Sequence, residues 1–106
     1  MAFRAFRVKF TANAKQEARE ILAWLREQSA GEAGLRWFEG LKSAIGSLRE
    51  FPARCALAPE SQIFPVEVRQ LIYGRKPHQY RILFNIEADV VWILHIRQGR
   101  RDRLTH

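Results

Sequence analysis

The sequence contains a single cysteine, Cys55, and it lacks the features that define redox, metal and membrane proteins. One thiol cannot form an internal disulfide, and no His and Cys residues stand at metal-ligand spacing, so we expect neither a metal nor a cofactor. No apolar run is longer than that at residues 90–94, which is far shorter than the roughly 20 residues that cross a bilayer. No apolar stretch of the kind found in secretory signals follows the basic N-terminus. These absences predict a cytoplasmic protein that does not enter a membrane.

The size and composition of the chain fit one folded unit. With 106 residues, of which 47% are hydrophobic and 27% charged, the chain is too short to divide into two domains with separate cores. The hydrophobic fraction is also too high for a disordered chain. We therefore predict a single domain that spans residues 1–106.

Acidic residues are scarce relative to basic ones. Eleven Asp and Glu face eighteen Lys and Arg, which gives a net charge of +7, and fourteen of the cations are arginines. Guanidinium groups bind phosphate and carboxylate through two parallel hydrogen bonds, so this composition predicts phosphate-bearing or acidic partners. The alternative is a basic C-terminus that only aids solubility. The densest cluster consists of Arg97, Arg100, Arg101 and Arg103.

Hydrophobic periodicity predicts the order of the elements. Residues 6–10 alternate as in a strand, and residues 13–28 and 35–51 repeat as in two amphipathic helices that form an antiparallel hairpin. Residues 52–65 hold three of the four prolines and are expected to form a connecting loop. Three strands then follow at residues 66–73, 79–86 and 90–97.

This order predicts an α+β fold with an N-terminal strand, an antiparallel helical hairpin and a three-stranded antiparallel meander that completes one sheet. In the last strand, Trp92 is expected on the core face, beneath the helices. The opposite face is expected to be uncovered. Four polar side chains would then converge on that open face beside the basic tail, namely Arg69, Arg81, His95 and Arg97.

The C-terminal third carries a resemblance to a known family. A strand that reads YRILF at residues 80–84 is followed by a strand and tail that read LHIRQGRRD at residues 94–102. Together with VRQL at residues 68–71, these segments resemble the RelE/ParE superfamily of bacterial toxins, which includes proteins described as plasmid stabilisation toxins. The resemblance implies the toxin of a type II toxin–antitoxin module. Such a toxin arrests growth when it is free of a cognate, acidic antitoxin, with which it forms a hetero-oligomer.

Members of this superfamily act in two ways, and the first is enzymatic. RelE-like members are endoribonucleases that cleave messenger RNA on the ribosome, which needs cations at the scissile phosphate and an acid–base group. Carried over to this sequence, the cations are Arg69, Arg81 and Arg101 (or its neighbour Arg100), and His95 is the acid–base candidate. The match is incomplete, because Glu67 replaces an expected basic residue and no Tyr follows Arg101. A structural alternative for Arg81 is an ion pair with Glu67 or Glu87.

ParE-like members poison DNA gyrase and are not known to be hydrolytic enzymes. The long hairpin, the proline-rich loop and the incomplete basic set favour this branch. The residues that would contact gyrase or its DNA are Arg97, Arg100, Arg101 and Arg103. A third hypothesis is a stand-alone basic module that binds nucleic acid, although the sequence carries no RNP, helix-turn-helix or zinc motif.

Overall fold

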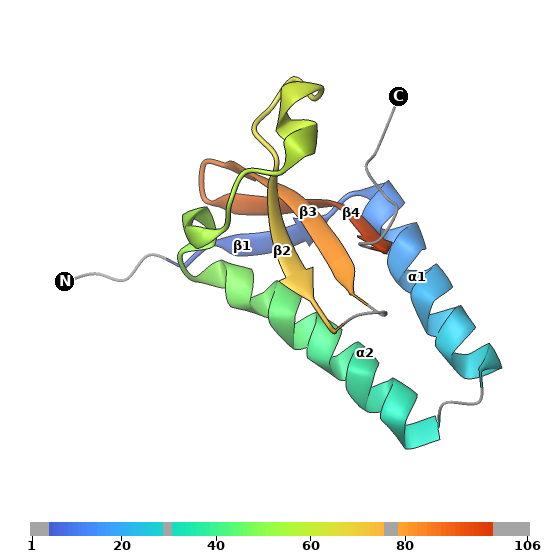
Figure 1. The fold of residues 1–106 in the computed structure, drawn as a ribbon. Coiled ribbons are helices and arrows are strands. Elements are labelled where there is room, and N and C mark those ends of the chain that lie inside the picture. Colours follow the sequence, from blue (N-terminus) through green and yellow to red (C-terminus); the bar gives the residue numbers. More distant parts are fainter. Residues whose placement is uncertain (1–4, 29–30, 76–78, 99–106) are drawn as a thin grey trace.

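The computed structural model describes residues 5–28, 31–75 and 79–98, and it confirms the predicted order of elements (Figure 1). Three single turns of 3-10 helix, η1, η2 and η3, lie between the second helix and the second strand. The bounds are β1 Arg7–Phe10, α1 Ala12–Glu27, α2 Gly31–Gly46, η1 Ser47–Arg49, η2 Pro52–Arg54, η3 Pro59–Gln62, β2 Arg69–Tyr73, β3 Tyr80–Glu87 and β4 Val90–Gln98.

The four strands form one mixed sheet in the order β1-β4-β3-β2. The predicted antiparallel meander is confirmed, because β2 pairs antiparallel with β3 and β3 with β4. β1 joins the other edge of β4 in parallel, with Arg7 opposite Val90 and Phe10 opposite Ile93. The first and last strands along the chain are therefore neighbours in space.

Thr11 starts the first helix. Its backbone is extended, and its hydroxyl accepts a hydrogen bond from the Ala14 N–H, which satisfies one of the free donors of the first turn. α1 begins and ends one residue earlier than the predicted range of 13–28. α2 likewise ends earlier than expected, at Gly46, and η1 continues the chain towards Pro52. The two helices run antiparallel, and they lie nearer to each other where α1 ends and α2 begins than at their other ends (Figure 1).

The helices cover one face of the sheet and build the main core there. Ile82 and Phe84 are fully buried and lie on the same face of β3, as their spacing of two residues requires. They pack with buried side chains from both helices and from β4, namely Ala14, Ile21, Leu41, Ile45, Val91, Ile93 and Ile96.

The opposite face of the sheet is not open, so the prediction of an uncovered face is wrong. Leu83 points to that face and is fully buried, in a second cluster with Ala58 and Val68. Phe64 and Leu94 pack against this cluster. The covering side chains come from the connection between α2 and β2, so a loop buries this part of the sheet.

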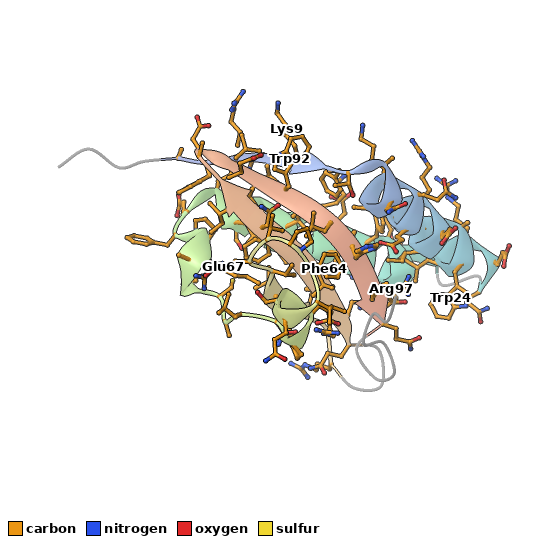
Figure 2. The ribbon with its side chains drawn as sticks, turned by 90° about the horizontal axis from the view of Figure 1, so that it is seen from above. Lys9, Trp24, Phe64, Glu67, Trp92 and Arg97 are labelled. Carbon is orange, nitrogen blue, oxygen red and sulfur yellow. The ribbon has the colours of Figure 1, made fainter. Side chains whose placement is uncertain are left out.

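A bulge in β4 overturns the predicted core face of the last strand. His95 lies opposite Leu83 and Ile93 lies opposite Phe84, so Leu94 is an extra residue that has no counterpart in β3. Because of this extra residue, Val91, Ile93 and Ile96 share the helix-covered face. Trp92 is consequently outside the main core, and the Lys9 ammonium lies 5.8 Å from its ring centroid (Figure 2).

Candidate functional site

Arg81 is buried on the face of the sheet that the second cluster covers. There it forms a bidentate ion pair with Glu60 of η3. Nη1 donates to Oε2 at 2.7 Å and Nη2 donates to Oε1 at 2.6 Å. The Gln70 side-chain oxygen accepts from Nε at 3.0 Å and from Nη2 at 2.8 Å. The side chains of Arg81 and Glu60 are 9% and 2% exposed. The predicted ion-pair partners, Glu67 and Glu87, are therefore wrong, since the carboxylate comes from the connecting loop.

Arg69 also binds the connection between α2 and β2. Its guanidinium donates to the Cys55 carbonyl at 2.7 Å and to the Ala53 carbonyl at 3.4 Å, and it lies 3.8 Å from the Glu67 carboxylate. Two of the three arginines that the RelE-like hypothesis places at a scissile phosphate thus bind the protein's own loop.

A second polar cluster joins α1 to the end of β4 around Glu17. One carboxylate oxygen lies 3.1 Å from His95 Nδ1 and accepts from Arg97 Nη1 at 3.1 Å. The other oxygen accepts from the Ile96 backbone N–H at 2.8 Å. The pairing of β1 with β4 ends at Ile93, so the Ile96 N–H lies beyond β1. The Glu17 carboxylate accepts the hydrogen bond that a neighbouring strand would otherwise accept. Arg97 Nε is buried and has no hydrogen-bond partner among the described residues.

Thr11 explains why Glu17 of α1 lies beside the end of β4. The Thr11 hydroxyl lies 3.1 Å from the carbonyl oxygens of both Ile93 and Leu94, and its N–H donates to the Ile93 carbonyl at 3.0 Å. These contacts fix the first turn of α1 against the bulge. One and a half turns later, Glu17 reaches the edge of β4.

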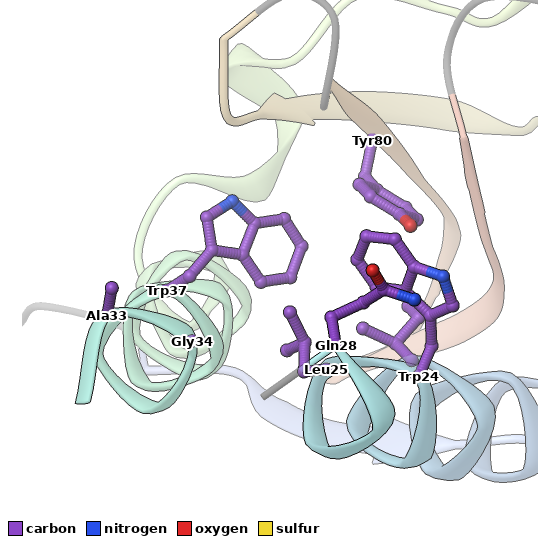
Figure 3. Close-up of a pocket in the computed structure, with 8 residues that line it drawn as sticks. Trp24, Leu25, Gln28, Ala33, Gly34, Trp37 and Tyr80 are labelled. Carbon is purple, nitrogen blue, oxygen red and sulfur yellow. The ribbon is translucent and has the colours of Figure 1, made fainter. Parts of the chain in front are cut away.

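An aromatic pocket opens beside this cluster, between the two helices and β3 (Figure 3). Its volume is about 390 Å³, and Trp37 faces Trp24 and Tyr80 across it. Tyr80 and Trp37 stand edge to face with their centroids 5.3 Å apart. The remaining lining consists of Ile21, Leu25, Gln28, Ala33 and Gly34. A smaller hollow shares Trp24 and Tyr80 with it and extends to Glu17 and Arg97, so the pocket and the polar cluster are continuous. Trp24 is 45% exposed.

The predicted site residues thus separate into two groups. Arg69 and Arg81 hold the connecting loop, whereas His95 and Arg97 meet at Glu17. The remaining predicted residues, Arg100, Arg101 and Arg103, lie outside the described residues. The functional roles assigned to all of them stay predictions.

Sequence reasoning missed both acids that organise these groups. Glu17 falls on the apolar stripe of α1, three residues after Ala14 and four before Ile21, and an acid within such a stripe is a signal of a buried polar partner. Glu60 is the only acid between Phe51 and Val66, but its partner is 21 residues away and no local pattern points to it.

Cys55 is a buried, free cysteine. Burial raises the pKa of the Cys55 thiol, and the nearby Arg54 and Arg69 offset this only in part, so the thiol is protonated at neutral pH. Within residues 5–28, 31–75 and 79–98, no three His, Cys, Asp or Glu side chains gather into a metal-binding group. Neither described helix is long and apolar enough to cross a membrane.

The helical hairpin on a sheet of order β1-β4-β3-β2 is the fold of the RelE/ParE superfamily. The family model described as "ParE toxin of type II toxin-antitoxin system, parDE" matches residues 8–103, and the chain therefore belongs to this family of type II toxins. A solved structure of the chromosomal ParDE TA system from P. aeruginosa is similar, with a TM-score of 0.69 and 18% sequence identity. The match covers 90% of this chain and 97% of that one. No curated protein matches the sequence.

Proposed function

We propose that this chain poisons DNA gyrase and so arrests growth when it is free of its antitoxin. The observation that carries the proposal is the burial of Arg81. A cation that stabilises a scissile phosphate has to reach it, and the Arg81 side chain is 9% exposed, with its guanidinium bound by both Glu60 and Gln70. Arg69 is likewise bound to loop carbonyls. This arrangement supports the ParE-like branch, which needs binding surfaces but no hydrolytic chemistry of its own.

Binding of an acidic antitoxin is the second part of the proposal. The aromatic pocket of Trp24, Trp37 and Tyr80 is large enough for a bulky apolar side chain. Arg97 lies beside the pocket, and its side chain is 40% exposed. Its guanidinium is placed to bind a carboxylate of the antitoxin. An antitoxin segment with an apolar residue followed by an acid would fit this groove. Complementary charge with a +7 toxin would also speed the encounter.

One observation favours the RelE-like alternative. His95 Nδ1 lies 3.1 Å from Glu17, and a carboxylate beside an imidazole is the arrangement that orients a general acid or base. Arg97 binds the same carboxylate oxygen and would supply the cation of this cluster. A ribosome-dependent messenger RNA endonuclease would use this cluster in place of Arg69 and Arg81.

The test compares the two targets with the same purified toxin. In the first arm, the toxin is added to gyrase, relaxed plasmid and ATP, and both supercoiling and trapped cleaved DNA are measured. In the second arm, it is added to translating ribosomes, and the message is mapped for cuts by primer extension. Gyrase inhibition with intact message is the expected result. Cut message with unaffected gyrase would refute the proposal and favour the alternative.

A further inference from the structure

The connection between α2 and β2 has an unusual surface for a chain of net charge +7. We call residues 51–66 the connecting segment. Of the seven large hydrophobic side chains that are exposed in the described part of the chain, four belong to it. They are Phe51, Leu57, Ile63 and Val66, which are 71%, 49%, 46% and 42% exposed.

Both charges of the connecting segment are used within the fold. The Arg54 guanidinium folds back on the preceding turn, where it donates to the Glu50 carbonyl at 2.6 Å, to the Phe51 carbonyl at 3.1 Å and to the Ser47 hydroxyl at 3.0 Å. The Glu60 carboxylate is buried against Arg81. Arg54 remains at the surface, and the other exposed side chains of the segment are mostly apolar.

The backbone at Phe51 is held in a conformation that its sequence disfavours. Its φ of 49° is left-handed, which is rare for an aromatic residue, and the residue before a proline normally prefers an extended conformation. The Arg54 side chain and the Arg54 N–H, which donates to the Phe51 carbonyl at 3.0 Å, close the turn in this state. Strained backbone that the surroundings enforce is typical of functional positions. Here it presents an aromatic ring to the surface.

The connecting segment is also fixed to the sheet along its length. Arg69 binds the Ala53 and Cys55 carbonyls, and the Val68 N–H donates to the Ser61 hydroxyl at 3.0 Å. Phe64 packs on the second core cluster. A surface that is ordered before binding loses little conformational entropy when a partner arrives, which favours affinity.

We propose that the connecting segment is the surface with which this toxin binds its protein target, with the Phe51 ring as the central anchor. The inference rests on the proposed function, under which the target is gyrase. Interface centres are depleted in charge and enriched in aromatic residues, as this surface is. The partner it fits is a protein with an apolar pocket.

Charge favours the protein target over the other candidate partners of the connecting segment. Nucleic acid is bound through cations, and the connecting segment holds only one, Arg54, whose guanidinium is engaged with the preceding turn. A second copy of the chain would bring +7 against +7, which opposes association. An acidic antitoxin would be drawn to cations such as Arg97, whose side chain is 40% exposed and lies beside the aromatic pocket, rather than to a surface with one engaged cation.

The experiment uses three variants of the full chain and measures their affinity for gyrase by surface plasmon resonance. Phe51→Gly removes the ring and suits the left-handed backbone, so the fold is retained. Ile63→Ser changes a second exposed residue of the segment. Ile72→Ser is the matched control, because Ile72 is 44% exposed but lies on β2. We expect F51G and I63S to bind gyrase about tenfold more weakly or worse, and I72S to bind as the wild type does.

The same samples distinguish the other outcomes. Each variant is also titrated with antitoxin, and its mass in solution is measured by sedimentation. Equal gyrase binding by all four proteins would refute this inference and leave the proposed function intact. Wild-type toxin that does not bind gyrase would refute the proposed function, and with it gyrase as the partner of the connecting segment. Weakened antitoxin binding by F51G, or a wild-type dimer that F51G dissociates, would assign the surface to those partners and overturn the inference.

Discussion

The guanidinium of Arg81 and the carboxylate of Glu60 meet through two hydrogen bonds of 2.7 and 2.6 Å, although one residue lies on the central part of the sheet and the other on η3. This pair holds Arg81 inside the fold and away from an exposed binding site. An arginine in the YR strand of such a toxin suggests phosphate binding, whereas here it fastens the connecting segment to the sheet. Its removal should therefore act on stability before it acts on any target.

Arg81→Met should lower the free energy of unfolding by about 3–5 kcal/mol, because it leaves the Glu60 carboxylate buried without its cation. The double variant R81M/E60L should recover most of this loss, since apolar side chains often replace a buried ion pair at little cost. Urea unfolding followed by circular dichroism measures both. If the double variant is as unstable as R81M, burial of an uncompensated charge is not the cause.

Glu17→Ala should lower the free energy of unfolding by about 1–3 kcal/mol, because the Ile96 N–H, His95 and Arg97 lose their shared acceptor. Glu20→Ala is the control, since Glu20 is an exposed acid one turn further along α1. Amide hydrogen exchange should show faster exchange at Ile96 in E17A only. Unchanged protection of that amide would contradict the assigned role of Glu17.

Gly40→Ala should destabilise the protein by about 1–3 kcal/mol through overpacking, because a Cβ at this position would clash with the Tyr73 hydroxyl. That hydroxyl is held in place by its 2.8 Å hydrogen bond to the Trp37 carbonyl. Gly46→Ala is the matched control, since its Cβ would meet only the end of the Arg49 side chain. Thermal unfolding should rank G40A below the wild type and G46A close to it. Combining G40A with Tyr73→Phe should restore part of the loss.

Cys55 should make the protein less stable at alkaline pH. Burial raises its pKa above the ordinary value of 9.0, so its contribution to stability is complete below about pH 9 and is lost as the pH rises through the folded-state pKa. Melting temperatures between pH 7 and 10.5 should fall more steeply for the wild type than for Cys55→Ala. In the native protein, iodoacetamide should also label Cys55 more slowly at pH 8 than it does in urea. Equal labelling rates would contradict a buried, protonated thiol.

The elements were predictable from the sequence because their signals are local. Alternation at residues 80–86 and the apolar stripe of α1 depend on neighbours within a few positions, and the structure confirms both elements. The family resemblance rested on the same strands, and the family match confirms it. These features needed no knowledge of which segments meet in space.

The predictions that failed concern features that depend on one inserted residue in a strand or on contacts between residues far apart in the sequence. Leu94 adds one residue to β4, and a shift of one residue exchanges the two faces of a strand, so Trp92 was assigned to the wrong side. Glu60 and Arg81 are 21 residues apart, and Glu17 and His95 are 78 apart. No periodicity connects such pairs, so the loop that covers the sheet and the acid that gathers His95 and Arg97 became visible only in three dimensions.

The parallel pairing of β1 with β4 has a consequence for synthesis of the protein. β1 is the first strand to leave the ribosome, yet its only partner in the sheet is formed by residues 90–93. Until those residues emerge, β1 and the first turn of α1 have no sheet on which to settle. A nascent chain interrupted before that point would carry the helices and the connecting segment without a finished core. Translation that stalls midway through this message would therefore yield fragments for proteolysis rather than a working toxin.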